Sequence, residues 1–168
     1  MDATALYKFQ SGLYVVSAAT EDDYGACVIN TGLQLTSEPL QVMVAVNEQN
    51  HTEGVIEKAG HFALCPITQE ADMPYIGRFG FRTSTAFAKF DGIEKRETIL
   101  GDPFTPVASA CVLACQVVQK LDVGTHVVFV GEVKDAENLS DATPMTYAYY
   151  HSTLKGKTPP KASSYFKE

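Results

Sequence analysis

The sequence lacks the cysteine spacings and the long apolar segments that would place it in several common protein classes. Its four cysteines form no C-x-x-C pair, and no histidine lies at ligand spacing from a pair of them. A zinc or other metal site is therefore not expected. No apolar run approaches the ~20 residues that a membrane-spanning helix needs. The cysteines stand in apolar, strand-like segments, where we expect buried free thiols.

Basic residues are also few. The sequence has 13 Lys and Arg and 20 Asp and Glu, which gives a net charge of -7 and a pI of about 5.0. This balance argues against nucleic acid or an anionic membrane surface as the main partner. The opening residues, MDATALYKFQ, carry an early Asp and no apolar core of a signal peptide. We therefore expect a cytoplasmic protein.

Motifs for several kinds of catalysis are missing as well. The sequence has no G-x-G-x-x-G, no P-loop and no G-x-S-x-G, and its four histidines are widely spaced. Rossmann and Walker phosphate sites and a nucleophile elbow are thus not predicted. If the protein is an enzyme, its chemistry is expected to belong to a cofactor.

Short β-rich segments make up most of the chain. With 168 residues and 45% hydrophobic content, one domain is expected. The pattern predicts strands at 13–20, 26–30, 33–37, 42–47, 61–67, 108–121, 126–133 and 145–150, and helices at 50–60, 74–81 and 84–90. Neither βαβ alternation nor a repeat is present. The predicted fold class is mainly β, a Greek-key-type barrel with short peripheral helices.

Polar residues interrupt the apolar pattern between Asn30 and Pro39. Gln34 and Thr36 fall on one face of a predicted strand, with leucines on the other. Such a face suits either solvent or a flat heterocycle with alternating donors and acceptors. The pattern alone leaves both interpretations open.

A second polar segment, Val46–Thr52, joins a strand end to a helix N-terminus. Free N–H groups and the helix dipole favour a phosphate at such a point, and Asn50, His51 and Thr52 add side-chain donors. Simple capping of the helix by Asn50 explains the same residues equally well. Glu53 would repel a phosphate unless it turned back on the cap.

Together these segments resemble the flavin reductase-like, FMN-binding split-barrel family, in particular the flavin domain of high-molecular-weight rubredoxins and flavoredoxins. The similarity covers nearly the whole chain. It rests on the segments ALYKFQSGLYVVS, ACVINTGLQLTSEPLQVMVAVNEQNHT, IGRFGF, DVGTHVVFVGEV and MTYAYYH followed by KGKTPP. The expected flavin domain spans 1–151, and 152–168 form a basic, extended tail of the same domain.

The resemblance implies a homodimer with FMN near the subunit interface. By position, the implied ring contacts are Asn30, Thr31, Gln34 and Thr36. The implied contacts of the ribityl chain and phosphate are Asn47, Asn50, His51 and Thr52, with Arg82, Thr83 and Ser84 closing on the phosphate. His126 matches a histidine that the family places near the nicotinamide of NADH or NADPH, and it is the implied catalytic residue.

Two departures from the subgroup stand out. Gly25-Ala26 replaces a frequent Asn-Gly, and Thr83–Ala86 replaces Ser-Gly-Arg-Asp. The C-x-x-C iron ligands of a rubredoxin domain are absent from the sequence, so the expected acceptor is a separate rubredoxin or flavodiiron protein. The leading hypothesis is an NAD(P)H-dependent flavin reductase. The alternatives are an FMN-binding electron carrier without nicotinamide activity and a dimer that has lost flavin.

Overall fold

A seven-stranded antiparallel sheet forms the body of the molecule in the computed structural model, which describes residue 5 and residues 8–165. The strand order is β2-β1-β5-β8-β9-β4-β3. The strands are β1 (Tyr14–Ala19), β2 (Tyr24–Ile29), β3 (Leu33–Ser37), β4 (Leu40–Asn47), β5 (His61–Pro66), β8 (Cys111–Asp122) and β9 (His126–Asn138). Val, Ile and Phe, which favour strands, supply many of the buried positions of β1, β2, β4 and β9.

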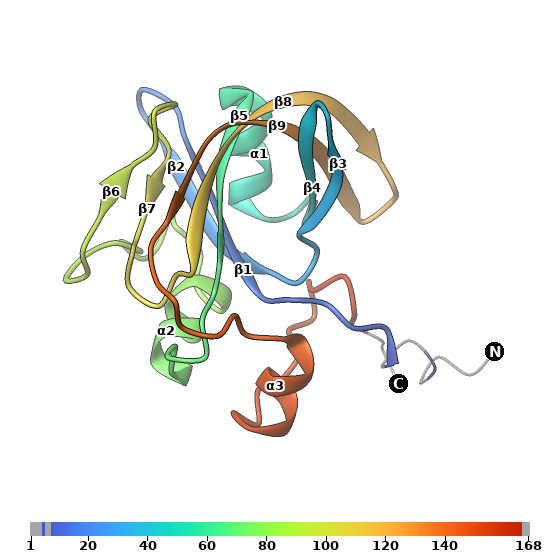
Figure 1. Ribbon diagram of the computed structural model, residues 1–168, viewed down its shortest axis with the longest axis vertical. Coiled ribbons are helices and arrows are strands. Elements are labelled where there is room, and N and C mark those ends of the chain that lie inside the picture. The colour runs from blue at the N-terminus through green and yellow to red at the C-terminus, as the bar shows by residue number, and fades with distance from the viewer. Residues whose placement is uncertain (1–4, 6–7, 166–168) are drawn as a thin grey trace.

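The sheet curls into a barrel with an opening between β2 and β4 (Figure 1). These two strands lie far apart in the hydrogen-bonded order, yet they approach each other in space. The barrel interior is filled by apolar side chains that include Val16, Val44, Phe62 and Phe129, each at most 1% exposed. The predicted fold class, a mainly β split barrel with short helices, is confirmed.

Helix α1 (His51–Ala59) packs across β1 and β2 and has the ends that the sequence predicts. The Asn50 side chain accepts a hydrogen bond from the Thr52 N–H at 3.1 Å, and Gly60 ends the helix in the left-handed conformation at φ 73°. Glu53 does not complete a capping box, because the Asn50 N–H donates to the Asn47 carbonyl instead.

Two further helices, α2 (Met73–Gly80) and α3 (Tyr147–Ser152), lie at one end of the barrel (Figure 1). The predicted strand at 145–150 is wrong, since α3 takes up most of it. Thr146 caps this helix by accepting from the Tyr149 N–H, and Tyr147 stacks on Tyr150 one turn later at 12° between the rings.

The predicted helix at 84–90 is also wrong. The segment forms turns, in which the Ala86 and Phe87 N–H groups both donate to the Thr83 carbonyl. Polar contacts with β2 take the place of helical hydrogen bonds. The Ser84 hydroxyl accepts from the Ala26 N–H, and the Lys89 N–H donates to the Tyr24 hydroxyl.

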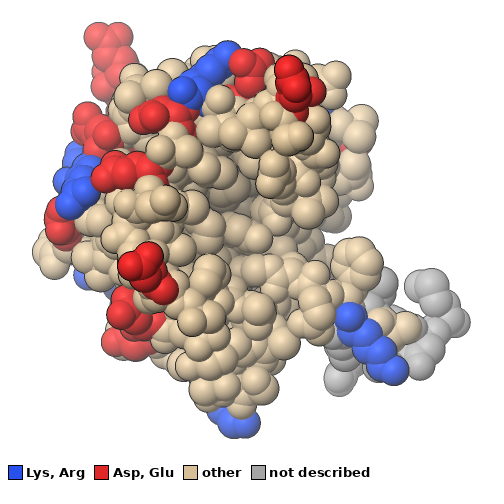
Figure 2. Space-filling model, in the orientation of Figure 1, with Lys and Arg blue, Asp and Glu red and all other residues tan. Residues whose placement is uncertain are grey.

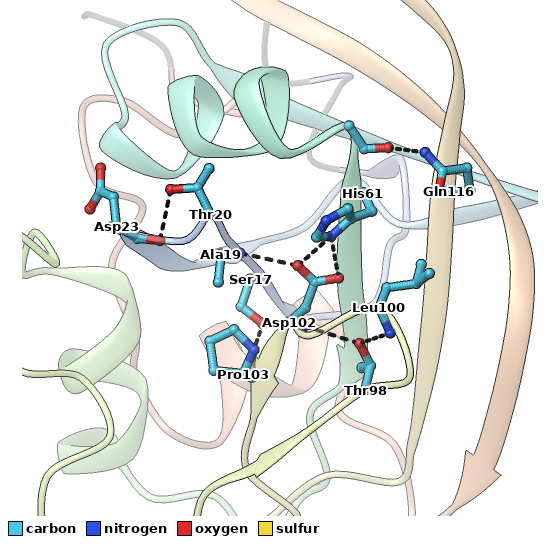
Figure 3. A network of polar contacts seen from close by, with 11 residues as sticks. Ser17, Ala19, Thr20, Asp23, His61, Thr98, Leu100, Asp102, Pro103 and Gln116 are labelled. Atoms are coloured by element: carbon cyan, nitrogen blue, oxygen red, sulfur yellow. Dashed lines mark hydrogen bonds and ion pairs between the residues drawn. The ribbon is translucent and has the colours of Figure 1, made fainter.

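A small two-stranded ribbon, which the sequence analysis missed, lies beside the barrel. It consists of β6 (Arg96–Glu97) and β7 (Pro103–Phe104). Figure 3 shows how Asp102, at the start of β7, reaches the barrel: its carboxylate accepts from the Ala19 N–H at 3.1 Å and lies 2.8 Å from Nδ1 of His61. The Ser17 hydroxyl donates to the Pro103 carbonyl at 2.5 Å.

The four cysteines are free, and Cys27, Cys65 and Cys115 are buried. Burial raises the pKa of Cys27 to about 11 and that of Cys115 to about 12. In the described part of the chain, no group of three His, Cys, Asp or Glu side chains is placed to hold a metal ion.

Charged side chains are unevenly distributed over the surface. In Figure 2 acidic residues gather along the upper and left edges, with a few basic ones among them, and the centre of this face carries no charge. Among the described residues, no helix is long and apolar enough to span a membrane.

Candidate functional site

The opening between β2 and β4 contains a small cavity that brings predicted site residues together. Asn30 follows β2, Asn47 ends β4, Asn50 precedes α1 and His126 begins β9. All four line one cavity of about 60 Å³, together with apolar residues of both strands. Residues that lie up to 96 positions apart in sequence are thus neighbours here, because β4 pairs with β9 and Asn47 stands opposite His126.

His126 is half-buried in this cavity, and its Nδ1 lies 2.9 Å from the Thr125 hydroxyl. Burial lowers the pKa of His126, while the neighbouring Lys161 carbonyl opposes that change. The imidazole is therefore predominantly neutral at pH 7 and has one donor and one acceptor nitrogen.

Thr31 holds the two sides of the opening together. Its hydroxyl donates to the Ala45 carbonyl at 2.7 Å and accepts from the Ala45 N–H at 3.1 Å. The structure does not bring Gln34 and Thr36 into the cavity. Both lie on edge strand β3, where Gln34 is exposed and the Thr36 hydroxyl bonds to the backbone of Glu38.

The predicted phosphate residues meet around the start of β2. His51 Nε2 lies 3.0 Å from the Asp23 carboxylate. Thr52 is buried and packs on Gly25, where an added Cβ would lie 2.5 Å from the Thr52 Cα. Glu53 is buried beside them, and its pKa is raised by burial and then by Glu57. A less acidic Glu53 reduces the repulsion of an anion at this helix terminus.

The loop Arg82–Ser84 also contacts β2. Ser84 accepts from the Ala26 N–H at 3.1 Å, while Arg82 and Thr83 are exposed. The Arg82 guanidinium lies 4.3 Å from the centre of the Phe87 ring. Ser84 therefore bonds to β2 one residue from Gly25, which packs on Thr52 of α1.

The C-terminal tail, which was predicted to be extended, folds back onto the cavity. The Asn47 amide donates to the Lys161 carbonyl at 3.2 Å. The Ser163 hydroxyl donates to the Asn30 side chain at 2.8 Å, and the Asn30 amide donates to Ser164 at 3.2 Å. The tail packs here because these asparagines offer donors and acceptors that an extended tail would leave to solvent.

A larger cleft of about 1040 Å³ lies on the other side of the tail. Tyr14, Thr31, Gly32, Met43 and Tyr147 contribute to its walls, as do Ser163 and Ser164. The cleft is of the size that cofactor sites have, and it shares Asn30, Tyr147 and Ser163 with the inner cavity. Its walls are mainly apolar and carry amide and hydroxyl groups, a donor and acceptor set that fits a flavin ring.

Sequence reasoning missed several residues of this site. The Tyr147 hydroxyl lies 2.7 Å from that of Thr158 and accepts from Ser164 at 3.0 Å, so it anchors the tail. Both segments, MTYAYYH and KGKTPP, are visible in the sequence, but their local pattern predicts a strand and an extended tail. No sequence pattern marked Lys89, which is buried beneath the Arg82–Ser84 loop.

Comparisons with known proteins agree with this geometry. A family model described as flavin reductase like domain matches residues 6–157. The ferric-chelate reductase (NAD(P)H) of Archaeoglobus fulgidus is 43% identical, over 99% of this chain and 98% of the relative. The high molecular weight rubredoxin of Moorella thermoacetica is 36% identical, over 98% of this chain and 72% of the relative.

A solved structure shows the same fold. The flavoredoxin of Methanosarcina acetivorans superposes with a TM-score of 0.70 at 19% identity, covering 82% of this chain and 75% of that one. The resemblance seen in the sequence is confirmed by the family match. This chain belongs to the flavin reductase-like family of oxidoreductases.

Proposed function

We propose that the chain is an NAD(P)H-dependent flavin reductase that holds FMN non-covalently at the opening between β2 and β4. The observation that carries this proposal is the convergence of Asn30, Asn47, Asn50 and His126 on one cavity of a flavin reductase-like fold. Bound FMN supplies two-electron redox chemistry that side chains lack. The chain contributes binding, orientation and exclusion of water.

Each part of the site has a proposed role. The amides of Asn30 and Asn47 bind the polar edge of the ring, and Thr31 keeps β4 in place beside it. The first turn of α1 and the loop Arg82–Ser84 hold the phosphate. His126, neutral because burial lowers its pKa, donates to or accepts from the carboxamide of the nicotinamide and so fixes its orientation.

We further propose that two copies form a homodimer. Apolar side chains are exposed along β3, at the start of β4, and at the end of β8 and the turn after it: Leu33, Leu35, Leu40, Val118, Leu121 and Val123 are between 39% and 62% exposed. Such a group of exposed apolar residues is typical of a protein interface. A dimer would also cover the cleft next to Thr31 and Leu33.

The proposed acceptor is a separate redox protein or a ferric chelate. The similarity to a high molecular weight rubredoxin supports a rubredoxin, and that to a ferric-chelate reductase supports iron. A flavodiiron-type protein is a further proposed acceptor. Because NAD(P)H is the proposed donor, we place the reaction in the cytoplasm.

One observation favours a second function, an FMN-binding electron carrier without nicotinamide activity. The Lys161 carbonyl accepts from Asn47 and lies against His126, the residue proposed to orient the nicotinamide. If this contact persists with flavin bound, the nicotinamide is excluded and electrons enter from a protein partner.

One experiment tests both functions. The purified chain is titrated with FMN, and the loaded protein is mixed anaerobically with NADH or with NADPH. We expect FMN to stay bound to the protein and its absorbance to bleach when NADH or NADPH is added. Ferric citrate or rubredoxin should then restore the absorbance. Bleaching by dithionite but not by either nicotinamide would establish the carrier, and absence of FMN binding would refute both.

A further inference from the structure

Lys89 is a buried lysine for which the proposed site gives no direct role. Its side chain is 0% exposed, whereas the other lysines that the structure describes are exposed. Lysine is among the residues least often fully buried, because its ammonium loses hydration unless it finds partners. Hydrogen-bond partners inside the protein must therefore offset the lost hydration.

All three polar groups of Lys89 have partners. The ammonium donates to the Phe79 carbonyl at 3.0 Å and to the Arg82 carbonyl. The backbone N–H donates to the Tyr24 hydroxyl at 3.0 Å, and the backbone carbonyl accepts from Arg78 at 3.1 Å. The Phe79 carbonyl belongs to the last turn of α2, where the helix dipole favours a cation.

These contacts determine the position of the loop that precedes Lys89. By binding the Arg82 carbonyl, the ammonium closes residues 82–89 into a ring. The Tyr24 contact fixes one end of that ring to β2, and the Ser84 contact with Ala26 fixes the other. The backbone that carries Arg82, Thr83 and Ser84 is therefore held in place by contacts near both of its ends.

We propose that Lys89 is a positioning residue that arranges the Arg82–Ser84 loop for the phosphate of FMN and adds a buried positive charge behind it. This inference rests on the proposed function, which assigns the loop to the phosphate. The charged or titratable groups around the ammonium are the Cys27 thiol from β2 and the Arg82 guanidinium from the loop. Burial lowers the pKa of Lys89 to about 8, so the ammonium is largely protonated at pH 7.

The test compares FMN with riboflavin, which has the same ring and ribityl chain but no phosphate. Dissociation constants for both are measured by fluorescence quenching on the full chain and on Lys89→Met, Lys89→Arg and Lys95→Met. We expect Lys89→Met to weaken FMN binding about tenfold and to leave riboflavin within about twofold. Lys89→Arg should recover part of the loss, and Lys95→Met, at an exposed lysine six positions further along the chain, should bind as the unmodified chain does.

The outcomes separate the inference from the function on which it rests. Equal weakening of FMN and riboflavin, or no change in either, would overturn the positioning role. Failure of the unmodified chain to bind either flavin would refute the proposed function. Should Lys89→Met fail to fold, Tyr24→Phe removes only the backbone tether and keeps the charge. That variant should still lower the preference for FMN over riboflavin, and an unchanged preference would count against the proposal.

Discussion

Gly25 allows helix α1 to touch the barrel at the point where the proposed phosphate site begins. A Cβ on Gly25 would lie 2.5 Å from the Cα of Thr52, a backbone atom that cannot rotate away. Gly54, two residues after Thr52 in the same helix, would accept a Cβ with nothing within 4 Å of it. The two glycines therefore form a natural pair of sites for the same substitution.

We predict that Gly25→Ala destabilises the protein by about 1–3 kcal/mol, because β2 and α1 must separate. Gly54→Ala should instead stabilise it by up to about 1 kcal/mol through helix propensity. Urea unfolding monitored by circular dichroism measures both. A Gly25→Ala chain as stable as the unmodified one would show that the contact between β2 and α1 is loose.

At the scale of elements, the ribbon β6–β7 depends on one buried carboxylate. Asp102 is 0% exposed and accepts from Ala19 and His61, whose own side chain is 21% exposed (Figure 3). Burial raises the pKa of Asp102, and His61 opposes the rise. Without His61 the carboxylate would keep the hydrogen bond from the Ala19 N–H but lose the one from the imidazole.

We predict that His61→Ala lowers the free energy of unfolding by about 3 kcal/mol at pH 7, since it leaves a buried carboxylate without its imidazole hydrogen-bond partner. In that variant the folded-state pKa of Asp102 lies above the unfolded value. Its stability is therefore highest below the unfolded pKa and decreases as pH rises through the folded one. Urea unfolding between pH 4 and pH 7 should show the defect of His61→Ala shrinking toward acid.

A surface pair provides the control. Lys120 and Glu57 lie 2.5 Å apart but are both about half exposed, so Lys120→Ala should change stability little at either pH. A His61→Ala defect that stayed constant from pH 7 to pH 4 would show that lost packing, and not the carboxylate, is responsible.

The elements that sequence reasoning predicted well are those with local signals. Asn50 and Gly60 mark both ends of α1, and Pro74 opens α2. The segments at 84–90 and 145–150 were assigned incorrectly because their conformation depends on distant partners. Lys89 and Ser84 bond to β2, and Tyr147 bonds to the tail, so their local propensity was overridden. The ribbon β6–β7 is too short to produce a periodic pattern.

At the scale of the whole molecule, the tail competes with a ligand for the polar groups of the site. Asn30 and Asn47, the proposed ring contacts, are bonded to Ser163, Ser164 and the Lys161 carbonyl. A ring that takes these partners must displace that part of the chain. The fraction of molecules with the tail displaced then limits the rate and affinity of binding.

We predict that a chain ending at Lys157 associates with FMN about tenfold faster than the full chain. The truncation keeps the hydrogen bond from the Tyr150 hydroxyl to the Lys157 carbonyl and so preserves the anchor of α3. Stopped-flow quenching of flavin fluorescence measures the rate. A chain ending at Tyr165 retains the tail contacts and is the control; equal rates for the two truncations would refute the competition.

The sequence alone indicates polar residues of the site, but not which of them come together or which of them bind the tail. Asn30, Asn47, Asn50 and His126 were predicted and do line one cavity. Gln34 and Thr36 were predicted with them, but a bulge in the pairing of β3 with β4 and the exposure of β3 leave them outside it. The tail contacts join residues more than 110 positions apart, which no local pattern reveals.

The reactivity of the buried thiols can report how often the barrel opens transiently. With pKa values near 11 and 12, Cys27 and Cys115 are almost entirely protonated at neutral pH, and no reagent reaches them in the closed molecule. Alkylation must therefore proceed through molecules that have transiently opened. The rate at which iodoacetamide labels each cysteine, read by mass spectrometry, would map local stability strand by strand without any mutation.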